Sequence, residues 1–219
     1  MFERDARFRI TSMKTIFALL LLAVLLTGCS AAFRSSAAVA QGRQELFQGK
    51  NADALESFEV AAREQPDFSF GVDRPEGVFS YLGRAQYLNG QYAQARQSLE
   101  RDLARHEGNS LSRLYLGLTL VRLNDRQNGL HAIVWGLSGI PYYINYVIDS
   151  ADAKDVRRFW DPDRQIRTAA AIALKMAERP DPNWNALISL SERIALAWER
   201  EPDFTRMSPD MKRPYNLNP

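Results

Sequence analysis

The sequence is poor in cysteine and histidine, the residues that most often build disulfides, thiol sites and zinc sites. It has one cysteine, Cys29, and two histidines among 219 residues. One cysteine cannot form an internal disulfide, and His106 and His131 lack the close spacing of zinc ligands. We therefore expect no metal site and no cofactor.

An excess of charge of one sign is also missing once the first 28 residues are set aside. That segment holds four of the 28 basic residues and two of the 26 acidic residues, so the remainder has 24 of each. Proteins that bind nucleic acid usually present a basic face. A nucleic-acid partner is therefore not expected.

Sequence motifs for catalysis are absent as well. The chain has no glycine-rich loop of the kind that holds phosphates or dinucleotides, and no motif around a serine nucleophile. Its carboxylates are scattered among arginines, and no pair of them can be assigned to hydrolysis. We expect no enzyme and no small-molecule substrate, and we keep an envelope hydrolase as an alternative.

What the sequence does have is a long apolar segment directly before its cysteine. Residues 15–26 form an uncharged run of 12 residues preceded by Lys14. This run is too short to span a bilayer, which takes about 20 apolar residues, but it suits a secretory signal peptide. The segment Leu26-Thr27-Gly28-Cys29 resembles the lipobox of bacterial lipoproteins. The resemblance implies cleavage before Cys29 and acyl chains, palmitate among them, on the new amino terminus.

The same resemblance implies a location. Because Ser30, and not an aspartate, follows the cysteine, the family's sorting rule favours the periplasmic face of the outer membrane over the inner membrane. We assign residues 1–28 to the signal peptide and residues 29–36 to a lipidated tether. A start at Met13 is an alternative to Met1, and an ordinary secretory leader or an uncleaved anchor are the other interpretations.

The middle of the chain repeats itself. Residues 81–103 align with residues 115–137 at a shift of 34, and a third copy lies upstream at a shift of 41. Its seven extra residues fall within residues 67–77, whose glycines and proline predict a loop. The matched positions include Gly42, Gly83 and Gly117 in one set and Phe58, Leu99 and Ile133 in another.

These copies resemble the tetratricopeptide repeat family. The residues that carry the resemblance are Leu82-Gly83, Leu116-Gly117, Gly90-Gln91-Tyr92, Ala54, Phe58, Ala61, Ala95, Pro66 and Pro141. It implies an all-α fold in which residues 37–141 form about three helical hairpins stacked in a right-handed superhelix. A glycine in the middle of a first helix, such as Gly83, is expected to let the second helix of its hairpin approach closely. Gly49 and Gly90 are expected to end the first helix of a hairpin in a left-handed conformation, a position that Asn124 takes in the third copy. Pro66 and Pro141 are expected to end the second helix of a hairpin.

More helices are predicted after the repeats. Asp161-Pro162-Asp163 and Asp181-Pro182-Asn183 each combine a capping residue with a proline, which is typical of a helix start. Apolar residues at helical spacing then run from Trp184 to Trp198. We interpret residues 142–204 as a helical cap on the last hairpin and residues 205–219 as an extended tail that leaves the fold.

Two surfaces are candidate binding sites. In tetratricopeptide proteins the first helices of the hairpins line a groove that receives a peptide, and the alignment places Arg43, Phe47, Arg84, Tyr87, Leu118 and Arg122 there. Arginines beside apolar residues suit a segment with apolar and acidic side chains. The second candidate is an aromatic cluster, interpreted either as core packing or as a docking patch of Trp135, Tyr142, Tyr143 and Trp160.

These observations predict a non-enzymatic, lipid-anchored adaptor of the bacterial cell envelope. We expect it to bind a partner protein through the groove and to contact the membrane through the acyl chains on Cys29. The alternative is a permanent accessory subunit of a larger envelope, secretion or pilus complex, for which the aromatic cluster is the buried contact.

Overall fold

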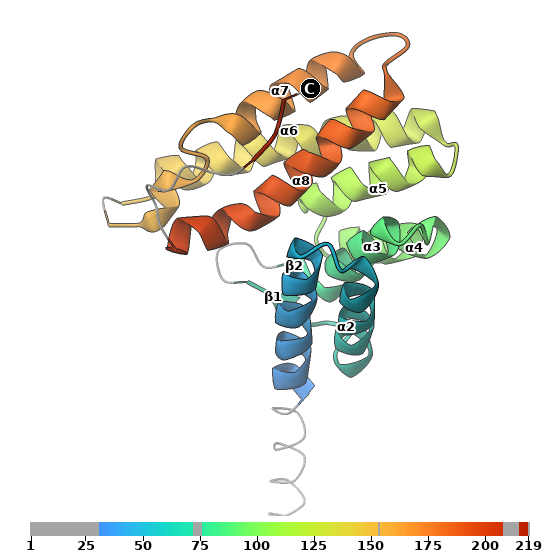
Figure 1. Cartoon of the computed structure of the whole chain (residues 1–219), viewed down its shortest axis with the longest axis vertical. Helices are drawn as coiled ribbons and strands as arrows, with labels where there is room; N and C mark the ends of the chain where they lie inside the picture. The colour runs from blue at the N-terminus through green and yellow to red at the C-terminus, as the bar shows by residue number, and fades with distance from the viewer. Residues whose placement is uncertain (1–30, 72–75, 153, 208–214, 219) are drawn as a thin grey trace, which may run out of the picture. The chain divides into compact units, whose positions relative to one another are not determined.

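Helices make up most of the chain, as Figure 1 shows. The structure is a computed structural model that describes residues 31–71, 76–152, 154–207 and 215–218. Within these ranges eight α-helices follow one another. They are the helix of residues 31–47, α2 (Asn51–Glu64), α3 (Val78–Leu88), α4 (Tyr92–Leu103), α5 (Ser110–Arg122), α6 (Arg126–Ser150), α7 (Gln165–Ala177) and α8 (Trp184–Met207). The expectation of a helical fold is confirmed at this level.

Three short elements join the helices. Strands β1 (Ser69–Phe70) and β2 (Glu76–Gly77) pair antiparallel, and the 3-10 helix η1 (Val156–Phe159) precedes α7. The strands lie within residues 67–77, which the sequence predicted as a loop. The main-chain N–H of Val78 also donates a hydrogen bond to the carbonyl of Phe68, so this segment is held by more than the strand pair.

The chain divides into two compact units, residues 1–78 and residues 79–219. In the first unit, the helix of residues 31–47 packs on α2. A Cβ atom built on Gly42 would lie 2.6 Å from a ring carbon of Phe58, so only a glycine allows this approach. Ser35 is fully buried and its hydroxyl donates to the carbonyl of Ala61. Residues 31–36 are therefore helical and packed, whereas the sequence placed them in a tether.

Close helix contacts recur in the second unit at the positions matched in the sequence. A Cβ on Gly83 of α3 would lie 2.6 Å from the Leu99 side chain of α4. A Cβ on Gly117 of α5 would lie 2.5 Å from the main-chain nitrogen of Ile133 of α6. Each glycine thus lets the next helix of its pair approach closely.

The turns inside the helix pairs also share one conformation. Gly49, Gly90 and Asn124 all have a positive φ, at 74°, 74° and 66°. Glycine adopts this left-handed region easily, and asparagine does so more readily than most other residues. The expectation for the two glycines is confirmed, and Asn124 takes the same conformation in place of a glycine.

The prediction that Pro141 ends a helix is wrong. Helix α6 continues through it to Ser150, and Ile144 and Val147 beyond the proline are buried. A proline inside a helix removes one hydrogen bond and costs about 3 kcal/mol. Burial of the apolar face after residue 141 offsets this cost, because each large aliphatic side chain removed from water contributes about 1.5–3 kcal/mol.

Side-chain caps fix the starts of the last two helices. Asp161 accepts hydrogen bonds from the main-chain N–H groups of Ile166 and Arg167, so it caps α7 as predicted, although the helix begins only at Gln165. At α8, Asn183 accepts from the N–H of Ala186. Asn183 therefore caps α8.

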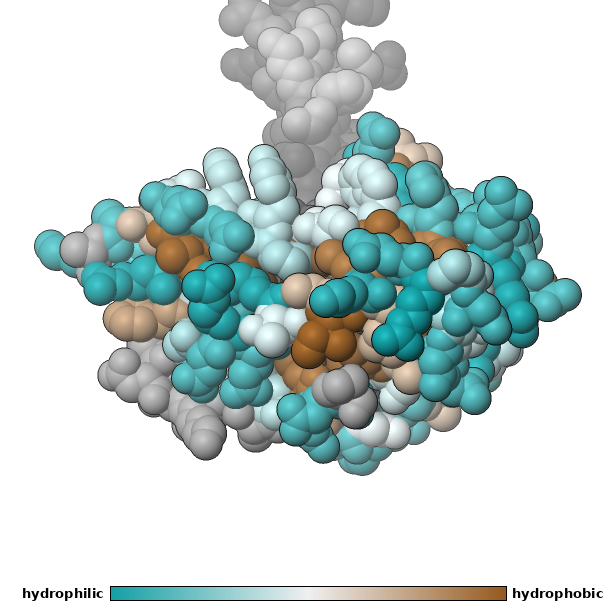
Figure 2. Space-filling model, turned by 90° about the horizontal axis from the view of Figure 1, so that it is seen from above, coloured by the Kyte–Doolittle hydropathy of each residue, from teal (hydrophilic) through white to brown (hydrophobic). Residues whose placement is uncertain are grey.

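Helix α8 carries the predicted apolar stripe into the core of the second unit. Leu187, Leu190, Ile194 and Trp198 are at most 1% exposed. The helices α6, α7 and α8 lie alongside one another in Figure 1. On the face seen in Figure 2, hydrophilic side chains cover most of the surface and apolar ones gather in small patches.

The end of the chain differs from the expected tail. Helix α8 reaches Met207, inside the segment 205–219 that was predicted to be extended. Beyond it, Leu217 is only 8% exposed, and the Tyr215 hydroxyl donates to the carboxylate of Glu201 at 2.8 Å. The described residues 215–218 thus pack on the second unit, because they supply an apolar side chain to its core and a donor to a buried carboxylate.

Candidate interaction surfaces

Helix α8 covers the face of α3 and α5 where the sequence predicted groove residues. The Tyr87 hydroxyl of α3 donates a hydrogen bond of 2.6 Å to a carboxylate oxygen of Glu192 on α8. The Arg122 guanidinium of α5 lies 3.7 Å from the same oxygen. Burial raises the pKa of the Tyr87 phenol well above its usual value, and the hydrogen bond to Glu192 acts in the same direction.

A second acidic residue of α8, Glu199, contacts the same face seven residues after Glu192. Arg84 of α3 is fully buried, and its guanidinium lies 3.0 Å from the Glu199 carboxylate, which is 4% exposed. The Arg84 guanidinium also donates to the carbonyl of Ser80 and lies 4.4 Å from the ring centre of Tyr81. The buried pair therefore ties α8 to α3 at a defined register.

The face of α3 and α5 has the residue types predicted for the groove wall, but the segment that packs on it is α8 of the same chain. Arginines, a tyrosine and apolar side chains receive a helix that carries glutamates and apolar residues. Arg84 and Leu118 are fully buried and Tyr87 is 4% exposed, so the structure does not leave the predicted wall open at these three positions. Arg122 remains at the surface, with its side chain 41% exposed.

The other two predicted groove residues lie in the first unit. Arg43 and Phe47 are both partly buried on the helix of residues 31–47. The Arg43 guanidinium lies 5.4 Å from the ring centre of Phe47 and 5.7 Å from that of Phe70. Cation–π contacts of this kind hold the arginine against the first unit's own aromatic rings.

Of the predicted aromatic docking patch, Trp160 belongs to the core and the partly buried Tyr143 packs against it. Trp160 is 1% exposed and packs edge-on against Trp198 of α8, with ring centres 5.4 Å apart. The ring centre of Tyr143 lies 6.3 Å from that of Trp160 and 5.9 Å from that of Trp198. For these residues the core-packing interpretation fits the structure.

The other two residues of that patch are exposed, and they share a face of α6 with a third aromatic residue. Trp135 is 46% exposed, Tyr142 75% and Tyr146 60%. Spacings of seven and four residues place all three side chains on one side of a helix. We call Trp135, Tyr142 and Tyr146 the aromatic stripe. Tyr146 was not among the predicted patch residues, although its position one turn after Tyr142 could have indicated it.

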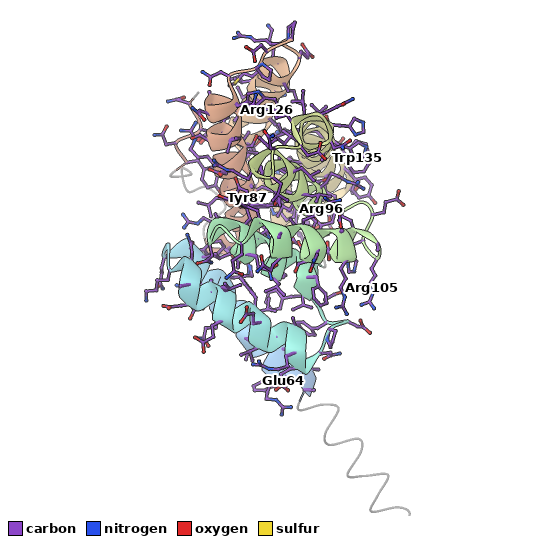
Figure 3. The ribbon with its side chains drawn as sticks, turned by 90° about the vertical axis from the view of Figure 1, so that its right-hand side faces the viewer. Glu64, Tyr87, Arg96, Arg105, Arg126 and Trp135 are labelled. Atoms are coloured by element: carbon purple, nitrogen blue, oxygen red, sulfur yellow. The ribbon has the colours of Figure 1, made fainter. Side chains whose placement is uncertain are left out.

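The helix that carries the aromatic stripe is packed into the core along its opposite side. The opposite side of α6 is buried at Leu137, Ile140 and Ile144, which are all fully covered. At one end of the stripe, the Arg113 guanidinium lies 4.8 Å from the ring centre of Trp135. Trp135 lies at the outer edge of the second unit in Figure 3. These side chains are therefore exposed on an element that is itself firmly packed.

One polar cluster brings serine, histidine and aspartate together, but its geometry is not that of a nucleophilic site. Asp102 accepts hydrogen bonds from the Ser112 hydroxyl at 2.7 Å and from Asn109, and lies 3.0 Å from Nδ1 of His106. The serine bonds the carboxylate directly, whereas catalysis needs the histidine between them. Ser112 and its neighbour Ser80 are also fully buried. The cluster joins the ends of α3, α4 and α5.

Within the ranges that the structure covers, no three His, Cys, Asp or Glu side chains are grouped so that they could hold a metal ion. An open cleft of about 480 Å³ lies at the end of α7, lined by Ile172, Lys175, Met176, Glu178, Arg179 and Pro180. In the same ranges no helix is both long and apolar enough to cross a bilayer.

Cys29, the predicted lipid attachment residue, and the signal peptide lie outside the described residues.

Comparisons with known proteins identify no relative, so the function is argued from the surfaces described above. A scan of protein-family models, a search of curated proteins and a search of solved structures each returned no match to this chain.

Proposed function

We propose that this protein is a non-enzymatic adaptor of the bacterial cell envelope that binds a partner protein through the aromatic stripe of α6. The observation that carries the proposal is the exposure of Trp135, Tyr142 and Tyr146 on one face of a packed helix. Tryptophan and tyrosine are the residues most enriched among those that dominate binding energy. Their rings add large apolar contact area and lose few rotamers on binding, so a rigid display of three favours an interface.

The partner expected from this surface is apolar at its centre. The stripe offers aromatic faces and phenol hydroxyls, with one guanidinium stacked on Trp135 at its end. A shallow groove or a second helix with apolar residues at spacings of three and four would complement it. The closed face of α3 and α5 plays no part in this proposal.

We also propose that residues 37–141 are tetratricopeptide-like repeats that form a right-handed superhelix. Three contacts support the repeats, because a glycine meets a large residue 16 positions later in each copy. These pairs are Gly42 with Phe58, Gly83 with Leu99 and Gly117 with Ile133. The shared left-handed turns at residues 49, 90 and 124 support the same alignment.

Attachment to the outer membrane is the third part of the proposal. It rests on the sequence Leu26-Thr27-Gly28-Cys29, which has the residue types of a lipobox after an apolar run. Several acyl chains on Cys29 would hold the protein stably, since each buried methylene contributes about 0.8 kcal/mol and a single chain binds only marginally.

The adaptor proposal is tested by a triple variant in which Trp135, Tyr142 and Tyr146 become alanine. Intact protein is captured from solubilised envelopes, and each copurifying protein is then purified and its Kd for the wild type and the variant measured. We expect a partner whose Kd rises at least about 30-fold, because loss of a hot-spot side chain costs 2 kcal/mol or more. Leu123→Ala, which also truncates an exposed apolar side chain, should leave the Kd unchanged.

Two outcomes would count against the adaptor. If every captured partner binds the triple variant as tightly as the wild type, the aromatic stripe is not the binding surface. If the purified chain aggregates alone and becomes monodisperse only with its partner, the alternative of a permanent subunit is favoured. The thermal unfolding midpoint of the variant is the control for folding, and it should match the wild type because the three side chains are exposed.

A further inference from the structure

The first turns of the helix of residues 31–47 leave an apolar face uncovered. Phe33 is 75% exposed, and Ala37 and Ala40 are also exposed. Spacings of four and three residues place the three side chains on one side of the helix. The opposite side, at Ser35 and Val39, is fully buried. A large aromatic side chain therefore stands on a face that the described part of the first unit does not cover.

Charge is nearly absent from this stretch. Residues 31–42 contain one charged residue, Arg34, and the first acidic residue after them is Glu45. The Arg34 guanidinium lies 2.6 Å from the carboxylate of Glu64 on α2, so it is held at the side of the helix. A lipid surface could cover the face of Phe33, Ala37 and Ala40 without burying an unpaired acidic group, which would be costly.

The short chain segment between Cys29 and this face would keep the face close to the bilayer. Only Ser30 separates Cys29 from residue 31, and two residues span at most about 7 Å. Phe33 lies two helical residues further, a rise of about 3 Å. The Cα atom of Phe33 is thus within about 10 Å of the Cα atom of Cys29, and interfacial helices bury their apolar faces about 5–10 Å into the bilayer boundary.

We propose that Phe33 inserts into the lipid–water interface beside the acyl chains and that the bilayer is the occupant of the face formed by Phe33, Ala37 and Ala40. This inference rests on the acylation of Cys29 proposed above. Burial of one phenylalanine side chain strengthens membrane residence by on the order of tenfold. It also gives the first unit a defined contact with the membrane, which a flexible tether would not provide.

Hydroxyl-radical footprinting with mass spectrometry tests the inference on the native side chain. The acylated wild type is reconstituted alone into vesicles of phosphatidylethanolamine and phosphatidylglycerol, and a Cys29→Ser form in water is the reference. Tyr142 is the matched control because it has the same exposure of 75% but lies in the second unit. We expect Phe33 to lose most of its oxidation on vesicles and Tyr142 to keep its oxidation.

The same spectra separate the two ways in which this idea can fail. An N-terminal peptide without acyl chains on Cys29 would refute the proposed lipid anchor itself. An acylated peptide in which Phe33 is oxidised at the rate seen in water would leave the anchor intact and overturn the insertion of Phe33. Because only protein and lipid are present, protection of Phe33 but not Tyr142 supports contact with the bilayer and excludes cover by a partner protein.

Discussion

Replacing Arg84 by methionine should destabilise the second unit more than most single substitutions do. The Arg84 guanidinium lies 3.0 Å from the Glu199 carboxylate, and the two side chains are 0% and 4% exposed. Methionine has a similar length and no charge, so the variant keeps much of the volume and removes the cation. Glu199 is then left as a buried carboxylate without this partner.

The magnitude follows from the separation and the burial. Two unit charges 3.0 Å apart attract by about 5.5 kcal/mol at an effective dielectric constant of ~20. When one partner of a buried pair is removed, the measured cost is about 3–5 kcal/mol, because the remaining charge stays desolvated. We therefore expect Arg84→Met to lower the free energy of unfolding by about 3–5 kcal/mol. The double variant Arg84→Met/Glu199→Met should recover most of this loss, since the carboxylate that the single substitution leaves buried is removed as well.

Urea unfolding followed by circular dichroism measures the four corners of this double-mutant cycle. Arg96→Met is the surface control, because Arg96 and Glu100 form an exposed pair one helical turn apart whose loss should leave the unfolding midpoint unchanged. An Arg84→Met variant within about 1 kcal/mol of the wild type would refute the reasoning. A double variant as unstable as the single one would refute it too.

Two further predictions concern helix contact and pH. Gly117→Ala should lower the free energy of unfolding by about 1–3 kcal/mol in the same urea assay, because its Cβ would lie 2.5 Å from the main-chain nitrogen of Ile133. Gly108→Ala is the control and should be tolerated, because a Cβ there meets nothing within 4 Å. Equal losses of stability in the two variants would contradict this prediction. The raised pKa of Tyr87 means that its hydroxyl stays protonated in the fold while the unfolded chain ionises above about pH 10. Wild-type stability should therefore fall as pH rises from 10, and Tyr87→Phe, which also loses the bond to Glu192, should show a shallower fall between pH 9.5 and 11. Parallel slopes would rule out this role.

The helices themselves were well predicted because their signals are local. A left-handed turn residue and a capping aspartate act within a few positions, and a packing glycine meets a residue of the next helix only 16 positions later; Gly90, Asp161 and Gly83 do what the sequence indicated. Pro141 was misjudged because a proline raises the energy of a helix without forbidding it. The buried face that continues at Ile144 decides the outcome, and burial depends on helices that lie far away in the sequence.

The candidate surfaces were harder to predict for the same reason. The sequence identified the residue types of a wall that receives acidic and apolar side chains, but not that α8 supplies them through Glu192 and Glu199. Likewise, Tyr142 and Tyr143 are neighbours in sequence, yet one is exposed and the other packs on Trp160. Only their positions around the helix separate them, and this could be worked out once the buried side of α6 was known.

The position of α8 on α3 and α5 sets a threshold for any competitor. Helix α8 follows α7 through the short connection from Ala177 to Trp184, so its glutamates are presented to α3 and α5 by the same chain, at an effective concentration in the millimolar range or above. A free peptide with the same glutamates would have to exceed that concentration, or bind more tightly, to replace it. Helix α8 therefore occupies this face as part of the same hydrophobic core.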